Sequence, residues 1–123
     1  MITGTHILIY TSNPEADRAF FRDVLDFRAV DVGHGWLIFT APPSEIAVHP
    51  ADDDAGEGAG RHQLTFMCDD IVVTVRELRA KGIAIAGEPK EERWGVHVTM
   101  QLPGGVPVML YQPKHPTAIG GGV

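Results

Sequence analysis

The sequence is poor in cysteine and has no long apolar run. Cys68 is the only cysteine among 123 residues, so the chain cannot form an internal disulfide and gives no sign of an oxidising compartment. No apolar run approaches the ~20 residues that span a membrane. The first ten residues also lack the positive charges that open a secretory signal. We therefore expect a cytoplasmic protein without a membrane partner.

Positive charge is also scarce. Ten Lys and Arg residues stand against sixteen Asp and Glu residues, which gives a formal net charge of −6. Because proteins bind phosphate backbones and anionic lipids mainly through cations, nucleic acid is not expected as a partner.

The remaining composition is that of one globular domain. The chain is 44% hydrophobic and 21% charged, and its 14 glycines and 9 prolines separate apolar runs without forming a repeat. A domain of this length can fold without disulfides or a metal.

The first half of the chain predicts a strand, a helix and three further strands. Residues 6–11 are rich in β-branched and aromatic types, which favours a strand. Asn13 then provides an N-cap and Pro14 the first helical position of a helix that continues to Leu25. The three strands that follow are expected at 27–32, 36–41 and 45–49.

The same order recurs in the second half. A strand is expected at 63–68, and Asp69 and Asp70 cap a helix that ends before Gly82. Three more strands follow at 83–86, 96–102 and 107–112. The sequence thus predicts an α+β fold of two tandem βαβββ units, which form one cup-shaped mixed sheet with helices on its outer face. Unit one spans 5–50, a linker 50–60, unit two 61–113 and a frayed tail 114–123.

Strand alternation assigns the two faces of this sheet. The side chains predicted to pack on the helices are all apolar: Ile7, Ile9, Leu37, Phe39, Ile46, Val48, Leu64, Phe66, Val96, Val98, Met100, Val108 and Leu110. The other face mixes aromatic, thioether and polar groups, as ligand pockets do. Its predicted ligand-binding residues are His6, Tyr10, Trp36, His49, Gln63, Met67, Trp94, His97, Met109 and Tyr111. A face that covers a dimer partner is the alternative interpretation.

Residues 5–113 resemble the vicinal oxygen chelate superfamily, which includes glyoxalases, bleomycin-resistance proteins and ring-cleaving dioxygenases. The resemblance rests on the paired units and on two segments. The opening segment is His6 followed by Ala19-Phe20-Phe21-Arg22-Asp23-Val24-Leu25-Asp26-Phe27, and the closing one is Leu102-Pro103-Gly104-Gly105. Asp26 replaces the usual glycine at a helix end, where Asp tolerates the left-handed conformation.

The resemblance implies four metal-ligand positions on the concave face, usually held by His, Glu, His or Gln, and Glu. The matching residues here are His6, Ala47, Gln63 and Met109. Alanine cannot ligate, and a thioether suits hard or borderline ions poorly. A catalytic zinc-like site generally needs three protein ligands. We therefore expect no cofactor and no tightly bound divalent metal, with His6, Gln63 and His62 as weak candidates.

Several displaced ligands or catalytic groups stay open on sequence alone. Glu45 and His49 lie on the same face as Ala47, and a local bulge would turn His62 inward. His97 has a side chain suited to general-base chemistry near neutrality, but no orienting carboxylate is evident for it. Cys68 falls on the helix side, which favours an inert thiol.

These residues favour a small-molecule-binding protein for a planar or aromatic ligand, assembled as a homodimer. The alternative is a divalent-metal-dependent lyase or dioxygenase with a shifted ligand set, so enzymatic activity is undecided. A structural or regulatory dimer with a vestigial pocket is a third possibility.

Overall fold

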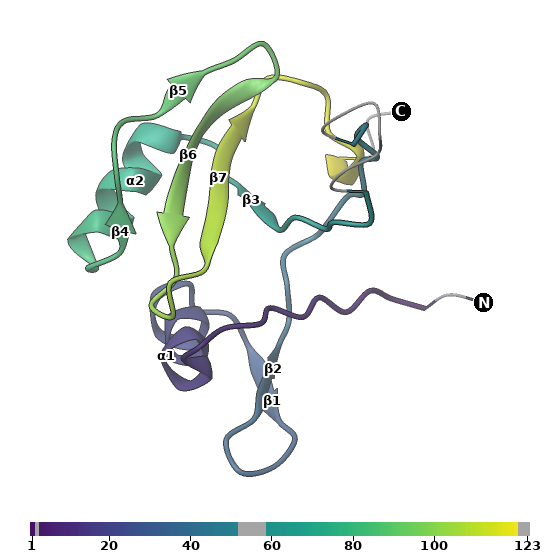
Figure 1. The fold of residues 1–123 in the computed structure, drawn as a ribbon, viewed down its shortest axis with the longest axis vertical. Coiled ribbons are helices and arrows are strands. Elements are labelled where there is room, and N and C mark those ends of the chain that lie inside the picture. Colours follow the sequence, from purple (N-terminus) through teal and green to yellow (C-terminus); the bar gives the residue numbers. More distant parts are fainter. Residues whose placement is uncertain (2, 52–58, 121–123) are drawn as a thin grey trace.

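The computed structural model describes residues 1, 3–51 and 59–120 (Figure 1). In chain order its elements are α1 (Pro14–Ala19), the π-helix η1 (Phe20–Val24), β1 (Ala29–Asp31), β2 (Leu37–Phe39), β3 (Thr65–Met67), α2 (Ile71–Ala80), β4 (Ala84–Ile85), β5 (Lys90–Glu91), β6 (Gly95–Gln101), β7 (Pro107–Pro113) and the 3₁₀-helix η2 (Ala118–Gly120). Most of the predicted linker lies outside the described residues.

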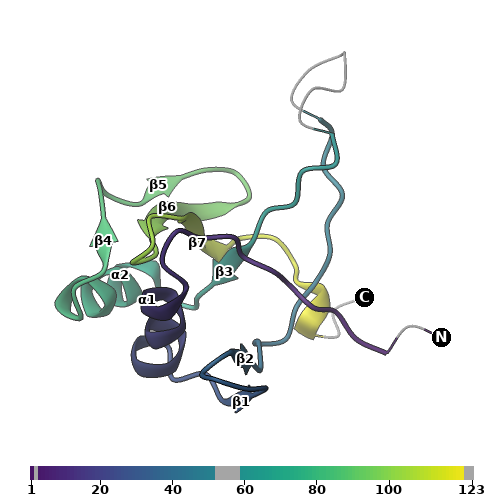
Figure 2. The same ribbon diagram turned by 60° about the horizontal axis from the view of Figure 1, so that its bottom comes forward.

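The strands form two sheets. β1 and β2 make an antiparallel pair, and a five-stranded sheet has the order β3-β7-β6-β4, with β5 also paired to β6. Only the β3–β7 pair is parallel, so this larger sheet is mixed and it curls without closing (Figure 2). The α+β class is as the sequence predicts, while the short strand β5 was not anticipated.

Unit two packs α2 against one face of its sheet. Asp70 caps the helix by accepting a hydrogen bond from the Val73 amide (3.1 Å), and Gly82 follows it at φ 86°. Val75 and Leu78 of α2 are buried together with alternate residues of the two long strands. Those strand residues are Val98, Met100, Val108 and Leu110. All four belong to the predicted helix-facing set, because burial selects every second residue of a strand.

The first helix begins as predicted but changes its winding. The Asn13 side chain accepts from the Ala16 amide (3.2 Å), and Pro14 is the first helical residue. After Ala19 the chain becomes a π-helix, in which the Leu25 amide bonds to the Phe20 carbonyl at 3.1 Å. Asp26 then adopts φ 58°, the left-handed conformation expected at this helix end.

Phe21 connects this helix to both sheets. Its ring contacts Phe27, Phe39 of β2 and Phe66 of β3, with centroid distances of 5.9, 5.5 and 6.3 Å. These aromatic contacts form the apolar part of the junction between the two units.

A polar contact at the β6–β7 turn fixes the same junction. The buried carboxylate of Asp17, 4% exposed, accepts the Gly104 amide at 2.6 Å, and the Ser12 hydroxyl donates to the Gly104 carbonyl at 3.2 Å. A Cβ atom on Gly104 would lie 2.0 Å from Thr11 Oγ1 and 2.9 Å from Asp17 Oδ2. Only glycine therefore allows the first helix to approach this turn.

The structure differs from the sequence prediction in unit one. Segments 6–11 and 45–49 have no strand assignment and no strand partner in the described part of the chain, and 3–12 runs as an extended arm (Figures 1 and 2). Apolar side chains predicted to pack on helices are exposed there: Ile7 by 52%, Ile46 by 83% and Val48 by 95%. The two units thus share no hydrogen-bonded sheet within the described residues.

The segment after β7 is also tied down rather than frayed over 114–118. The Lys114 amide donates to the Trp94 carbonyl (2.9 Å), and the Ala118 amide donates to Glu45 Oε1 (3.1 Å). This segment therefore joins unit two to the 45–49 segment of unit one. Of the helices that the structure describes, none has the length and apolarity to cross a membrane.

The Gly104 contact gives a stability prediction. Gly104→Ala should destabilise the fold by about 1–3 kcal/mol, because the new methyl group overlaps Thr11 and Asp17. Gly4→Ala is the matched control, since a Cβ there meets nothing within 4 Å. Urea unfolding of both variants measures the difference. Equal stabilities would show that the first helix is not held at this turn.

Candidate functional site

The five-stranded sheet has one face that α2 does not cover, here called the open face. Strand register aligns its side chains in two rows, Met67–Tyr111–His97 and Thr65–Met109–Thr99. Met67, His97, Met109 and Tyr111 are half-buried, and Thr99 is exposed. The open face therefore offers aromatic and thioether surface next to hydroxyl and imidazole groups.

Trp94 directly precedes β6 and lies beside the first row. Its ring stacks on the His97 imidazole, with centroids 5.0 Å apart and planes 25° apart, and meets Tyr111 edge-on at 5.6 Å. The indole nevertheless remains 41% exposed. These contacts hold an aromatic surface in a defined orientation with area left for a further partner.

His97 does have an orienting carboxylate, which corrects the sequence analysis. Glu92 Oε1 lies 3.4 Å from His97 Nε2, across the turn that joins β5 to β6. The pair was missed because β5 was not predicted, so the β5–β6 hairpin that returns Glu92 to His97 was not recognised. Such a pair can fix the ring orientation of the imidazole.

Tyr111 is linked to the C-terminal segment. Its hydroxyl lies 3.1 Å from His115 Nε2, and the two rings stack at 5.9 Å. Burial, with a smaller effect from the Glu45 carboxylate, raises the pKa of the Tyr111 phenol above its ordinary value of 10.0. The phenol therefore stays protonated near neutral pH. Sequence reasoning missed His115 because it treated residues 114–123 as frayed.

The other predicted site residues lie on the open face, in a separate cleft or outside both. Gln63 precedes β3, and its amide donates to Thr65 Oγ1 at 3.1 Å, on the open face. His6 and Trp36 instead line a separate cleft of about 360 Å³ between the N-terminal arm, the first helix, β2, and Leu64 and Phe66 at β3. Tyr10 is 86% exposed, and His49 contacts the Pro50 carbonyl.

The open face therefore unites one part of the predicted set: Gln63, Met67, Trp94, His97, Met109 and Tyr111. Within a single chain it does not include His6, Tyr10, Trp36 or His49. The Arg18 guanidinium lies over the Trp36 ring at 4.8 Å, so that indole already has a cationic neighbour.

The residues at the four implied metal positions do not fit a metal. The Ala47 side chain has no donor atom, and Met109 offers only a soft sulfur. His6 lines the cleft beside the N-terminal arm, which neither Gln63 nor Met109 lines. Glu45, a possible displaced ligand, accepts from the Ala118 amide. Over residues 1, 3–51 and 59–120, no three His, Cys, Asp or Glu side chains gather closely enough to hold an ion.

Cys68 is not placed for nucleophilic chemistry. It is half-buried directly after β3, and its Sγ lies 3.7 Å from the Tyr111 carbonyl oxygen. Burial raises the pKa of its thiol above the ordinary value, which lowers the thiolate fraction.

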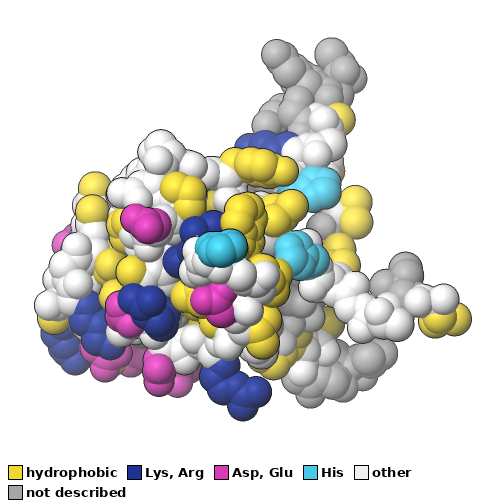
Figure 3. Space-filling model, turned by 90° about the horizontal axis from the view of Figure 1, so that it is seen from below, with side chains coloured by type: hydrophobic (Ala, Val, Ile, Leu, Met, Phe, Trp, Pro, Cys, Tyr) yellow, Lys and Arg dark blue, Asp and Glu magenta, His cyan; other side chains and the backbone are white. Residues whose placement is uncertain are grey.

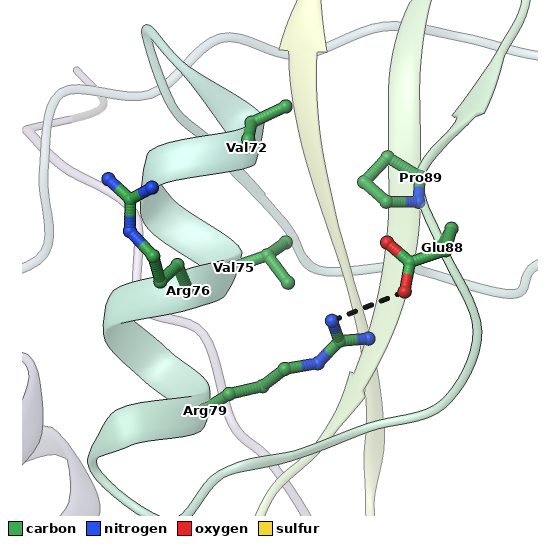
Figure 4. A pocket seen from close by; sticks show the side chains of 6 residues that line it. All are labelled: Val72, Val75, Arg76, Arg79, Glu88 and Pro89. Atoms are coloured by element: carbon green, nitrogen blue, oxygen red, sulfur yellow. Dashed lines mark hydrogen bonds and ion pairs between the residues drawn. The ribbon is translucent and has the colours of Figure 1, made fainter.

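A smaller hollow of about 270 Å³ lies beside α2 (Figure 4). Arg79 extends along it and donates to the Ile85 carbonyl at 3.0 Å and to Glu88 Oε1 at 3.5 Å. The guanidinium thereby ties the end of α2 to the loop after β4. None of the predicted site residues lines this hollow.

Three comparisons relate the chain to known proteins. A family model described as "Glyoxalase/Bleomycin resistance protein/Dioxygenase superfamily" matches residues 5–110. No curated protein sequence matches. Similar solved structures include the antibiotic binding protein TnmS3 from Streptomyces sp. CB03234, with 20% identity, a TM-score of 0.61, and coverage of 93% of this chain and 100% of that one.

Two further structures show the same likeness. Lactoylglutathione lyase from Agrobacterium tumefaciens is 20% identical, with a TM-score of 0.61 and coverage of 89% and 92% of the two chains. A superfamily member from Sphaerobacter thermophilus is 16% identical, with a TM-score of 0.59 and coverage of 90% and 98%. At these identities the likeness concerns the fold.

Proposed function

Because the chain belongs to the glyoxalase/bleomycin resistance protein/dioxygenase superfamily, we propose that it is a small-molecule-binding protein of the glyoxalase/bleomycin-resistance type. It holds a planar or aromatic ligand on the open face and works in the cytoplasm without a resident metal. The lone cysteine supports that compartment.

The orientation of Trp94 carries this proposal. One side of the indole rests on His97, its edge meets Tyr111, and 41% of the residue is exposed. An aromatic ring held in this way binds a planar ligand at little entropic cost, because the side chain is already ordered. Met67 and Met109 add polarizable surface that adapts to ligand shape.

The solved structures of similar fold include both kinds of protein under consideration. TnmS3 is described as antibiotic-binding, and the Agrobacterium protein as a lyase. The donor chemistry of this chain favours the binding protein, since Ala47 and Met109 occupy positions where the resemblance implies carboxylates. A lyase or dioxygenase with a shifted ligand set is the alternative that the metal experiment below would reveal.

A tryptophan titration tests ligand binding. In a Trp36→Phe background Trp94 is the only tryptophan. Planar aromatic compounds should quench or shift its emission, whereas aliphatic compounds of equal size should not. In the wild-type background, Trp94→Phe should weaken binding about tenfold by calorimetry, because the smaller ring stacks less surface. Trp94 emission that no member of a broad aromatic library changes would contradict the proposal.

Elemental analysis tests the absence of a resident metal. Protein purified without chelator and then dialysed should contain far less than one equivalent of zinc, nickel, iron or manganese. His6→Ala, assayed in parallel, should give the same metal content. A stoichiometric metal in the wild type that His6→Ala loses would establish the metal-dependent alternative.

We also propose that the functional form is a homodimer, and the unpaired segments of unit one support it. Tyr10, Ile46 and Val48 are 86%, 83% and 95% exposed, and segment 6–11 contains no Lys, Arg, Asp or Glu. Segment 45–49 contains only Glu45, whose carboxylate accepts from the Ala118 amide. In Figure 3, charged side chains lie over the body of the molecule and are absent from the protruding N-terminal arm. Exposed strand-like segments usually carry charges that prevent pairing, so this surface suits a covered interface.

The exposed apolar area of these two segments is compatible with a stable dimer interface. Each exposed apolar side chain offers roughly 60–120 Å², so the exposed residues of both segments supply several hundred Å² toward the ~800 Å² per subunit of a typical interface. A second copy that covers these segments would give their backbone groups partners as well.

Charge substitution tests the dimer. Light scattering should show a wild-type dimer of about twice 13.3 kDa and a Val48→Lys monomer. At a solvent-exposed site outside an interface the same substitution would barely change stability. Val72→Lys, at a residue 64% exposed on α2, should leave the dimer intact. A wild-type mass of 13.3 kDa at micromolar concentration would contradict the proposal.

A further inference from the structure

We propose that His115 determines which hydrogen-bonding groups a ligand must carry, because it fixes the direction of the Tyr111 hydroxyl. This inference rests on the proposed function insofar as Tyr111 faces the ligand. It assigns a specificity role to a residue outside the predicted site, in the segment that follows β7.

The tautomer of His115 follows from its two ring contacts. His115 Nδ1 lies 2.8 Å from the Pro116 carbonyl oxygen, and Nε2 lies 3.1 Å from the Tyr111 hydroxyl. A carbonyl oxygen can only accept, so Nδ1 carries the proton of the neutral ring. Nε2 is then an acceptor, and the Tyr111 hydroxyl must donate to it.

The surroundings hold this arrangement in place. The two rings stack with planes 28° apart, and the backbone of the preceding residue is fixed by the Lys114–Trp94 bond of 2.9 Å. Lys114 also pairs with Glu91, while the Ala118 amide bonds to Glu45. His115 is therefore anchored on both sides in the sequence, as a group that orients a neighbour must be.

The consequence for Tyr111 is a hydroxyl whose only hydrogen is already engaged. Its oxygen can still accept through its remaining lone-pair capacity, so toward the open face it acts as an acceptor. The Glu45 carboxylate near this phenol adds negative potential. A ligand edge that carries an N–H or O–H donor is favoured here. An edge with only acceptors would place its lone pairs against those of the Tyr111 oxygen.

The inferred ligand class is therefore a planar aromatic compound with a donor group at its edge, such as a phenol, an aromatic amine or an aromatic amide. Trp94 would supply the stacking surface, and Tyr111 would discriminate by hydrogen bonding. His115 acts through Tyr111 and is a positioning residue.

Nitrogen NMR of the ligand-free full chain tests the tautomer directly. At about pH 8.5, where imidazoles are neutral, the long-range ¹⁵N–¹H spectrum should show His115 protonated on Nδ1, whereas a histidine free in water prefers Nε2. His115→Phe identifies the signal, and Tyr111→Phe should keep the Nδ1–H form, because the Pro116 carbonyl still accepts from Nδ1, while the Nε2 resonance moves as it loses the Tyr111 donor. His34→Asn, in an exposed turn at φ 55°, is the matched control. An Nε2–H tautomer in the wild type would overturn the proposal.

A matched ligand pair tests the specificity role. At about pH 8 the wild type should bind 2-naphthol about 5–10-fold more tightly than 2-methoxynaphthalene, which has the same rings but no donor. In His115→Phe the ratio should fall toward one, because the released Tyr111 hydroxyl can donate to either compound. Tyr111→Phe should also lose the preference, while His34→Asn should keep it.

These outcomes separate this inference from the proposed function. If His115→Phe is folded by circular dichroism and keeps the wild-type preference for 2-naphthol over 2-methoxynaphthalene, the role of His115 is overturned even though ligands bind. If the wild type binds neither naphthalene, the proposed function loses support, and the NMR tautomer alone decides whether His115 orients Tyr111. If His115→Phe does not fold, the ratio in Tyr111→Phe replaces it, and an unchanged preference there would overturn the proposal.

Discussion

The contact between Asp17 and the Gly104 backbone determines where the first unit lies relative to the second. Asp17 is buried, and its carboxylate accepts the Gly104 amide at 2.6 Å, a charge-assisted bond in a site shielded from water. Because Gly104 lies in the β6–β7 turn, the bond ties the first helix to the same hairpin whose other end holds Trp94 and His115. The aromatic contacts of Phe21 reinforce this position. The placement of the first helix against the β6–β7 hairpin depends on this junction.

The candidate site depends in turn on strand register in unit two. Met67, Tyr111 and His97 belong to three strands but lie in one row because β7 pairs in parallel with β3 and antiparallel with β6. A shift of one residue in either pairing would turn one member of the row, Met67 or His97, toward α2. Trp94, Glu92 and His115 then gather at one end of the row through the β5–β6 turn and the segment after β7. Fold and site are thus linked by one hairpin.

The helix boundaries and the faces of the long strands could be predicted from the sequence. Helix caps at Asn13 and Asp70 and the glycine at position 82 depend on local chemistry, so their signals are present in a few neighbouring residues. The faces of β6 and β7 follow from alternation, which burial confirms at Val98, Met100, Val108 and Leu110. The segments 6–11 and 45–49 were predicted as strands but are not strands in the structure. Strand formation needs a partner strand, which local propensity cannot supply. Glu92 and His115 were missed because their roles arise from a short hairpin and a proline-rich segment without periodicity.

The central claim is that a planar ligand lies on the open face against Trp94, and methionine methyl groups provide the most direct measurement. Met67 and Met109 lie on this face, whereas Met100 is fully buried on the opposite side of β6. In ¹³C-methyl NMR of the full chain, the ring current of a bound aromatic compound should move the Met67 and Met109 signals and leave Met100 nearly unchanged. Saturable binding that moves none of the open-face methyl signals would contradict the account.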